Sequence, residues 1–372
     1  MKWRPKTFYR IAVVPSTCVL ALAMAAACSS GTSGSAGTSG KALTTVRFYE
    51  AATAPNILFE NIVIGEKLGY FAEAGIQPVF VDAGTNDATL EAGLENGQAQ
   101  VAVGVPANEI SLTVQAGHTL PTVNYYEYTY PSKYWIITAP NSPITSLSQL
   151  TGKSIGVVSL GTNDSAVLDS VLKSNGVSSS GVKQVAVGLG TPAYEAMASG
   201  KVAALMAYDT ELGTFDTLSQ KYKVLLSPNG IPRVGGFYIA ASRQYLNDHQ
   251  NIAVGFAQAV AKGTLFALAN PSAAASIYLS IYPNTATGDS LQTQVSQLVT
   301  SMKLRAEHWL PYTDPGTLGA IQPAEWQREL TFDPGGSQVT GGAAQFYTNA
   351  YIKAINNFDH AAITQQAKNY KS

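Results

Sequence analysis

Two kinds of apolar pattern alternate along this chain from about residue 41 onward. Short continuous apolar runs are typical of strands buried in a parallel sheet, and longer runs with apolar residues three or four positions apart are typical of helices. In the first stretch they predict a strand–helix–strand–helix–strand series at 44–49, 57–74, 77–81, 87–96 and 101–105. Such a series predicts a right-handed doubly wound α/β lobe.

The same order of elements recurs later in the chain. The second stretch predicts a strand–helix–strand–helix–strand series at 153–159, 165–174, 182–187, 193–199 and 202–207. The third units of the two stretches can be aligned, because NGQAQVAVGV at 96–105 and SGKVAALMAY at 199–208 each place a helix-ending glycine before a buried strand. We therefore predict two similar lobes, with long helices at 251–269 and 273–281 packing against the first.

Turn-forming residues indicate where the chain passes from one lobe to the other. They cluster at 141–143 (NSP) and at 229–236 (NGIPRVGG). We therefore assign 41–140 and 234–372 to lobe 1 and 141–233 to lobe 2. Two crossings between two lobes make a hinge, and a hinge predicts a central cleft that can close.

The N-terminal residues have a different pattern, that of a secretory signal peptide at 1–27. Basic residues up to Arg10 precede a mostly apolar run, and three alanines directly precede Cys28. This resembles a bacterial lipoprotein signal, which implies a lipid attached to Cys28 and an extracytoplasmic, membrane-anchored protein. Residues 28–40 (CSSGTSGSAGTSG) then form a Ser/Gly-rich tether. The alternative is an uncleaved anchor, although the apolar run is short for one and contains Pro15.

Composition excludes several function classes. Only 13% of residues are charged, the net charge is −1, and no basic stripe is present, so nucleic-acid binding has no support. The two cysteines are Cys18 and Cys28, so the mature domain has no pair for a disulfide and no cysteines for a metal site. The four histidines show no metal-binding spacing and no GxSxG motif occurs. We expect no catalytic residues, no metal and no cofactor.

In open α/β sheets, ligands bind beyond the carboxyl ends of the strands. That rule selects the loops at 51–56, 83–87, 106–108, 160–164, 188–192 and 208–211. The tetrapeptide GTND occurs in two of these loops, at 84–87 and 161–164, each time between a strand and a helix. Its residues either only cap the helices or also present hydrogen-bonding groups to a ligand. The convergence of six such junctions on one edge favours the second interpretation.

Tyrosines concentrate in the segment 125–135 (YYEYTYPSKYW). Alternation along a strand gives this segment two faces, one with Tyr126, Tyr128 and Tyr130 and the other with Tyr125, Glu127 and Thr129. The tyrosines either pack between the sheet and its helices or stack on a flat ligand in the cleft. We include Tyr128 as a candidate ligand-binding residue.

Two segments carry a family resemblance that extends over essentially the whole mature chain. GEKLGYFAEAGIQPVFV at 65–81 and LSQLTGKSIGVV at 147–158, with the repeated glycine-then-strand units, resemble periplasmic ligand-binding proteins of ABC importers. The branch is the one that serves nitrate, taurine, alkanesulfonates and thiamine pyrimidine precursors. The resemblance implies a two-lobed monomer that delivers its ligand to a membrane permease and its ATPase. The cysteine-rich motif of the pyrimidine-synthesising relatives is absent, so their enzymatic activity is not implied.

The resemblance also implies which loop residues contact the ligand. They are Asn56, Thr85, Asn86, Asn108, Thr162, Asn163, Tyr208 and Asp209, to which we add the acidic Asp164. Because the loops contain no arginine or lysine and several acids, they favour a neutral or amine-bearing, planar heteroaromatic compound. The alternatives are an alkanesulfonate, taurine or nitrate, which Arg233 would reach. Others are a ligand-sensing lipoprotein and a secreted enzyme on a similar scaffold.

Overall fold

The structure is a computed structural model that describes residues 42–50, 57–82, 87–106, 109–131, 133–160, 163–234, 236–286, 290–333 and 335–371. Residues 1–41 form a separate unit, and they lie outside the described residues. The expected signal peptide, tether and lipid-bearing Cys28 therefore stay predictions. Both sheets of the protein belong to the other unit, residues 42–372.

The first sheet, called sheet A here, has five strands in the order β2-β1-β3-β10-β4. Their bounds are β1 Thr44–Glu50, β2 Ile76–Phe80, β3 Val101–Pro106, β4 Thr122–Thr129 and β10 Phe237–Ser242. β1 pairs in parallel with β2 and β3, whereas β10 runs antiparallel between β3 and β4. The strands predicted at 44–49, 77–81 and 101–105 are confirmed.

The second sheet, sheet B, repeats this plan in the order β7-β6-β8-β5-β9. Its strands are β5 Tyr134–Thr138, β6 Ser154–Val157, β7 Lys183–Ala186, β8 Ala204–Tyr208 and β9 Lys223–Leu226. β6 pairs in parallel with β7 and β8, and β5 runs antiparallel between β8 and β9. The order second–first–third–antiparallel–fourth is therefore common to both sheets, which agrees with the expectation of two similar lobes. The antiparallel strands β5 and β10 are not part of the sequence repeat.

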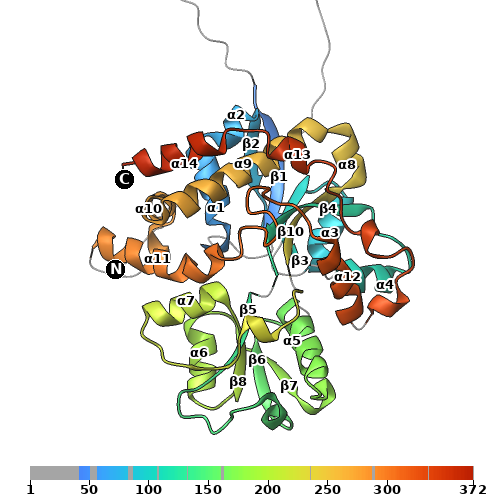
Figure 1. The fold of residues 1–372 in the computed structure, drawn as a ribbon, viewed down its shortest axis with the longest axis vertical. Coiled ribbons are helices and arrows are strands. Elements are labelled where there is room, and N and C mark those ends of the chain that lie inside the picture. Colours follow the sequence, from blue (N-terminus) through green and yellow to red (C-terminus); the bar gives the residue numbers. More distant parts are fainter. Residues whose placement is uncertain are drawn as a thin grey trace, which may run out of the picture. The chain divides into compact units, whose positions relative to one another are not determined.

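In each sheet the antiparallel strand is the first strand that the chain forms after leaving the other sheet. β5 follows β4 of sheet A, and β10 follows β9 of sheet B (Figure 1). The first crossing therefore lies between Thr129 and Tyr134, so the boundary expected near residue 141 is wrong. Pro131 explains the position, because proline cannot donate to a strand ladder and ends the tyrosine-rich strand there. The return crossing lies between Leu226 and Phe237, within the region that contains 229–236.

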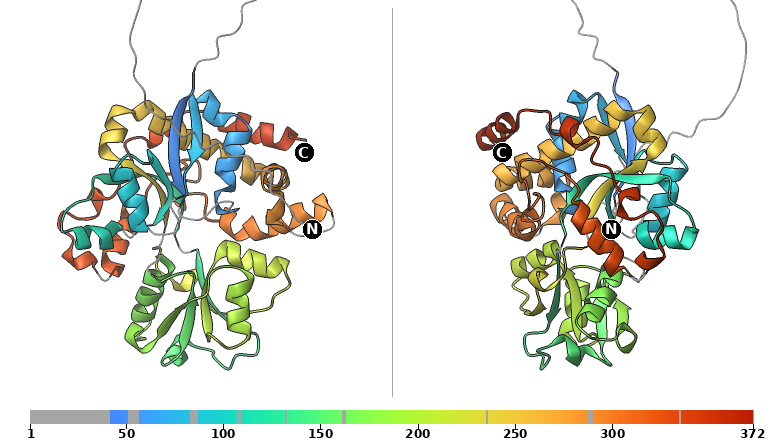
Figure 2. Two further views of the ribbon diagram at one scale, coloured as in Figure 1. Left: turned by 180° about the vertical axis from the view of Figure 1, so that it is seen from behind. Right: turned by 45° about the vertical axis from the view of Figure 1, so that its right-hand side comes forward.

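Helices cover both faces of sheet A (Figure 2). One face packs on the long helix α9, Gln250–Ala269, which is apolar enough to span a membrane but is largely buried as a core helix here. The helix predicted at 57–74 is broken at Gly69, whose φ of 83° is left-handed, so that α1 Glu60–Lys67 and α2 Tyr70–Glu73 are separate. The other helices that follow or precede strands of sheet A are α3 Asp87–Glu95, α4 Glu109–Ala116, α8 Arg243–Asp248, α10 Pro271–Ile281, α11 Leu291–Ala306, α12 Pro323–Phe332, α13 Ile352–Ile355 and α14 His360–Asn369.

Sheet B has a smaller set of helices, α5 Asn163–Ser174, α6 Thr191–Ala198 and α7 Asp209–Thr217. α5 contributes Leu168 and Val171 to the core on one face, and α6 and α7 contribute Met197 and Phe215 to the core on the other. Short 3-10 turns join these elements at Ile57–Phe59, Leu147–Leu150, Ser179–Gly181, Pro228–Gly230, Pro283–Thr285, Gly336–Gln338 and Ala343–Gln345. Both sheets are thus doubly wound, which confirms the predicted α/β class.

Candidate ligand-binding site

Half of the residues predicted to contact a ligand lie outside the described residues, and so their role stays a prediction: Asn56, Thr85, Asn86, Asn108 and Thr162. The other half can be placed. They are Tyr128 on β4, Asn163 and Asp164 at the start of α5, Tyr208 at the end of β8, and Asp209 at the start of α7.

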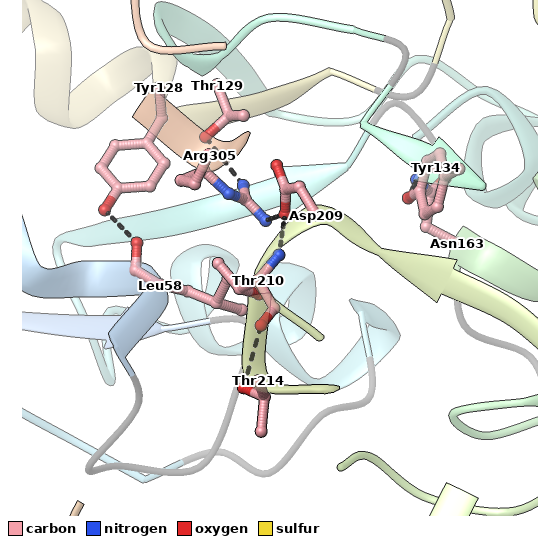
Figure 3. Close-up of polar contacts among 9 residues, drawn as sticks. All are labelled: Leu58, Tyr128, Thr129, Tyr134, Asn163, Asp209, Thr210, Thr214 and Arg305. Carbon is pink, nitrogen blue, oxygen red and sulfur yellow. Dashed lines mark hydrogen bonds and ion pairs between the residues drawn. The ribbon is translucent and has the colours of Figure 1, made fainter. Parts of the chain in front are cut away.

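Two of the placed residues meet a tyrosine from the crossing. The Asn163 amide Nδ2 donates a hydrogen bond of 2.7 Å to the Tyr134 hydroxyl, and Figure 3 shows the two side chains together. The Tyr134 and Tyr208 rings lie 5.0 Å apart at 48°. Asn163 and Tyr134 are buried, and Tyr208 is half-buried. Side chains from α5, β5 and β8 thus form an aromatic and amide cluster at the end of sheet B, where a planar ligand could stack and hydrogen-bond.

Asp164, by contrast, is used within its own lobe. It is completely buried, and its Oδ2 accepts a 2.7 Å hydrogen bond from the backbone N–H of Val158 just after β6. A carboxylate that accepts backbone N–H bonds beside a helix start holds the strand-to-helix turn in shape. This contact favours the first of the two interpretations of the GTND motif at 161–164, in which its residues stabilise the strand-to-helix junction rather than contact a ligand.

Asp209 is also engaged by the protein. Its Oδ1 accepts 2.7 Å bonds from the Arg305 Nη2 and from the backbone N–H of Thr210 (Figure 3). Arg305 Nη1 also donates to the Thr129 hydroxyl at 3.2 Å, and both charged side chains are fully buried. The ion pair therefore ties the end of β4, helix α11 and the start of α7 together. The second carboxylate oxygen of Asp209, Oδ2, has no hydrogen-bond partner among the described residues. A contact between this oxygen and a ligand remains a prediction.

Sequence reasoning from the loops missed Arg305, which comes from a helix 96 residues further along the chain than Asp209. A signal was nevertheless present. The buried residues Val295, Leu298 and Met302 of α11 follow helical spacing, and Arg305 continues that same face. An arginine on the apolar face of a helix requires a buried anionic partner.

The tyrosine-rich strand β4 packs in the core rather than standing open to a cleft. Tyr128 is buried, donates a 2.8 Å hydrogen bond to the Leu58 carbonyl and stacks on Phe59 with the ring centroids 5.8 Å apart. Tyr125 is fully buried and its hydroxyl reaches the Ala253 carbonyl of α9. These contacts explain the burial of Tyr128 by packing within the protein. Its contact with a ligand therefore stays a prediction.

Two basic side chains border the crossings. Lys133 is fully buried, with its ammonium 3.6 Å from the Phe237 ring centroid, and burial, together with nearby Arg305, lowers its pKa well below the usual value. Arg233, the residue that would favour an anion, lies over the Tyr312 ring at 3.9 Å. It lines a cavity of about 520 Å³ with Trp135 and His308.

Buried carboxyls make stability depend on pH. Burial raises the pKa of Glu60 and of Glu211 from 4.5 to about 8. Between about pH 4.5 and 8 these two carboxyls are protonated in the folded protein but ionised in the unfolded chain, so the free energy of unfolding falls as the pH rises. Their contribution to stability is complete below about pH 4.5 and is lost as the pH rises through about 8. Burial lowers the pKa of His308 to about 4, which has the opposite effect, but only between about pH 4 and 6.5. The lowered pKa of Lys133 also opposes the fall, but Glu50 shares the raised pKa of about 8 with Glu60 and Glu211, so the carboxyls outnumber it.

We therefore expect the melting temperature of the ligand-free protein to fall between pH 6.5 and pH 8. Scanning calorimetry at several pH values in this window measures the fall. Glu60→Gln is expected to make the fall shallower, because glutamine does not titrate and the variant therefore lacks one of the carboxyls whose pKa is raised. A melting temperature that rises across the window would contradict this assignment.

Comparisons with known proteins cover much of the unit that contains the two sheets. Residues 56–274 match the family model described as NMT1/THI5 like. The riboflavin-binding protein RibY of Chloroflexus aurantiacus is 26% identical over 303 residues, which cover 76% of this chain and 84% of RibY.

Solved structures with the same fold include a protein of Bordetella bronchiseptica RB50, with a TM-score of 0.65 and 18% identity over 84% of this chain and 96% of that chain. The periplasmic aliphatic sulphonate binding protein SsuA of Escherichia coli has a TM-score of 0.56 and 15% identity over 77% of this chain and 85% of its own. At these identities the similarity concerns the fold, which is that of periplasmic binding proteins.

Proposed function

Because this chain belongs to the NMT1/THI5-like family, we propose that it is the extracytoplasmic solute-binding component of an ABC importer. It captures a small organic nutrient between its two sheets and delivers it to a membrane permease and the associated ATPase. It performs no chemistry on the ligand. The lipid on Cys28 and the tether at 28–40 hold it, as a monomer, at the outer face of the membrane.

The observation that carries this proposal is the repeated sheet plan with two crossings. Sheets A and B have the same strand order, and the chain passes between them only at 130–133 and 227–236 in the part that the structure describes. Two short connections between two compact layers allow hinge motion while each sheet stays rigid. Polar and aromatic residues collect where these connections meet the sheets, which is where a ligand held by both would lie.

The charges near the crossings favour a neutral or amine-bearing planar ligand over an oxyanion. The buried Arg305 is already neutralised by Asp209, and Arg233 rests on Tyr312. The Tyr134–Tyr208–Asn163 cluster offers ring faces and an amide instead. The relative RibY is named for riboflavin, a planar nitrogen heterocycle. SsuA is named for aliphatic sulphonates, and an alkanesulfonate, taurine or nitrate ligand is the alternative.

Titration calorimetry tests the ligand class directly. We expect riboflavin or 4-aminopyrimidine to bind the purified protein and taurine and nitrate to give no heat. Tight binding of either anion alone would contradict the preferred class while leaving the solute-binding role intact.

A matched pair of variants locates the binding. Tyr208→Ala is expected to weaken binding of the heterocycle about tenfold or more, because it removes a stacking face at the end of sheet B. Tyr222→Ala is the control, because Tyr222 precedes β9 near the opposite end of that sheet, where Lys223 pairs with Thr138. Equal losses from both variants would argue against a ligand at the Tyr134–Tyr208–Asn163 cluster.

Two other functions remain to be distinguished. A sensing lipoprotein would bind the ligand in the same way but would be encoded beside a kinase rather than beside a permease and an ATPase. A secreted enzyme on this scaffold would convert the bound compound, which incubation with the protein followed by mass spectrometry would detect.

A further inference from the structure

Tyr312 lies between the two crossings and contacts both of them. Its hydroxyl donates a 2.8 Å hydrogen bond to the carbonyl oxygen of Pro131, which belongs to the crossing from sheet A to sheet B. The guanidinium of Arg233, which belongs to the return crossing, lies over the Tyr312 ring, 3.9 Å from its centroid. One side chain therefore joins the two connections on which a hinge motion of the sheets depends.

The segment that carries Tyr312 is itself attached to the first crossing. The backbone N–H of Tyr130 donates a 2.7 Å hydrogen bond to the His308 carbonyl, and the Tyr130 and Tyr312 rings meet edge to face with their centroids 6.0 Å apart. His308 Nδ1 lies 3.1 Å from the Tyr312 hydroxyl oxygen. Because the single hydroxyl proton goes to Pro131, we assign the proton of this second hydrogen bond to Nδ1. His308 thus orients the hydroxyl toward the first crossing.

The two contacts of Tyr312 differ in their environment. On the side of the first crossing, Tyr130, Pro131 and His308 are all buried, so this contact belongs to the packed interior. On the side of the return crossing, Tyr312 is 37% exposed and Arg233 is exposed. A cation over an aromatic ring in contact with water is a modest interaction, which can break and form again. Tyr312 is therefore fixed to one crossing and reversibly attached to the other.

The cavity of about 520 Å³ described above lies beside this contact. Tyr312 lines it together with Trp135 near the start of β5, Ser227 and Asn229 of the return crossing, and Glu307. β9 is the edge strand of sheet B and β5 is its neighbour, so the cavity lies at that side of the sheet. The carboxyl ends of the parallel strands β6, β7 and β8, where a ligand is expected, lie on the other side of β5. The return crossing therefore borders open space, which leaves it room to move.

We propose that Tyr312 is a positioning residue, which links the two crossings and thereby sets how the two sheets are held around a ligand. The inference rests on the proposed solute-binding function for its effect on binding, whereas the link itself is a property of the ligand-free protein. When either contact of Tyr312 is lost, the two crossings move independently. The arrangement in which both sheets reach the ligand is then less populated, and the apparent affinity falls by that fraction.

Distances between two spin labels test the link without any ligand. The labels are attached to Glu95→Cys on α3 and Lys173→Cys on α5, two exposed positions on helices beside different sheets. Cys18 and Cys28 are replaced by serine, so that the full-length protein carries no other thiol. Double electron–electron resonance should show one main distance in this background. Tyr312→Phe is expected to raise the population of other distances, relative to the main one, about two- to tenfold, the effect of one lost hydrogen bond.

A second variant removes the other contact of Tyr312. Arg233→Leu should change the distances in the same way, and adding Tyr312→Phe to it should change them little further, because a link released at one end no longer connects the crossings. Additive changes would overturn the proposal. The matched control is Tyr222→Phe, which removes a hydroxyl that bonds Asp216 within the part of the chain that forms sheet B. It should leave the distances unchanged, and a change equal to that in Tyr312→Phe would also overturn the proposal.

Two further measurements separate this role from a packing role and from the proposed function. A lower melting temperature of Tyr312→Phe with unchanged label distances would mean that the residue only stabilises the fold, which overturns the proposal. Titration calorimetry with whichever of riboflavin, 4-aminopyrimidine, taurine and nitrate the wild type binds should show an affinity that falls in proportion to the population of the main distance. An unchanged affinity would overturn the effect on binding. If none of the four binds the wild type, the solute-binding function fails, while the label distances still decide whether Tyr312 links the crossings.

Discussion

Arg305→Met is expected to lower the free energy of unfolding by about 3–5 kcal/mol, the largest loss that we expect from a single substitution. The variant leaves Asp209 fully buried at the start of α7 without its charged partner. It also removes the donor to Thr129 at the end of β4, so α7, α11 and β4 lose a common contact. Urea unfolding followed by circular dichroism measures the change.

A double-mutant cycle shows whether the loss comes from the pair. Because the stranded charge causes the damage, Asp209→Leu combined with Arg305→Met should recover a large part of the stability lost by either change alone. Additive losses in the double variant would mean that the two side chains contribute independently, and that the ion pair does not join these elements.

Gly213→Ala is expected to be the second most damaging change, although alanine is normally the better helix former by about 1 kcal/mol. Gly213 lies on α7 where that helix packs against α11, and a Cβ there would lie 2.5 Å from both the Cα and the carbonyl oxygen of Ser301. Backbone atoms cannot rotate away as a side chain does, so the two helices must separate. We expect a net loss of about 1–3 kcal/mol. We also expect weaker ligand binding, because α7 lies between β8 and β9 of sheet B whereas α11 follows the return of the chain to sheet A.

The control for this change is Gly181→Ala. A Cβ at Gly181 would meet only the Thr151 Cγ2, at an ordinary contact distance of 3.5 Å. Its melting temperature and ligand affinity should therefore match those of the wild type. A Gly213→Ala variant that is as stable as Gly181→Ala would show that α7 and α11 are not held in close contact in solution.

The local elements and their repetition could be predicted from the sequence, because strand and helix periodicity depends on near neighbours in the chain. The insertion of β5 into sheet B and of β10 into sheet A could not be predicted in this way. β5 and β10 enter their sheets by pairing with strands formed far away in sequence, and no local pattern specifies that choice. Within the tyrosine-rich segment, Pro131 is the local signal that the strand ends. It indicates the position of the crossing only once β4 and β5 are known to belong to different sheets.

The candidate site was predictable only where its residues belong to strand ends. Asn163 and Tyr208 were found in that way, and they lie with Tyr134 at the end of sheet B. The buried partner of Asp209, Arg305, comes from a helix face, which the rule on strand ends does not cover.

The position of β10 also affects how the chain acquires its structure during synthesis. All five strands of sheet B lie in the continuous segment from Tyr134 to Leu226, so this sheet has every strand it needs as soon as that segment has left the ribosome. Sheet A does not, because among the strands that the structure describes only β10 neighbours β4 in the sheet, and it emerges more than a hundred residues later. Until then the tyrosine-rich strand β4 has no neighbouring strand to pair with in sheet A.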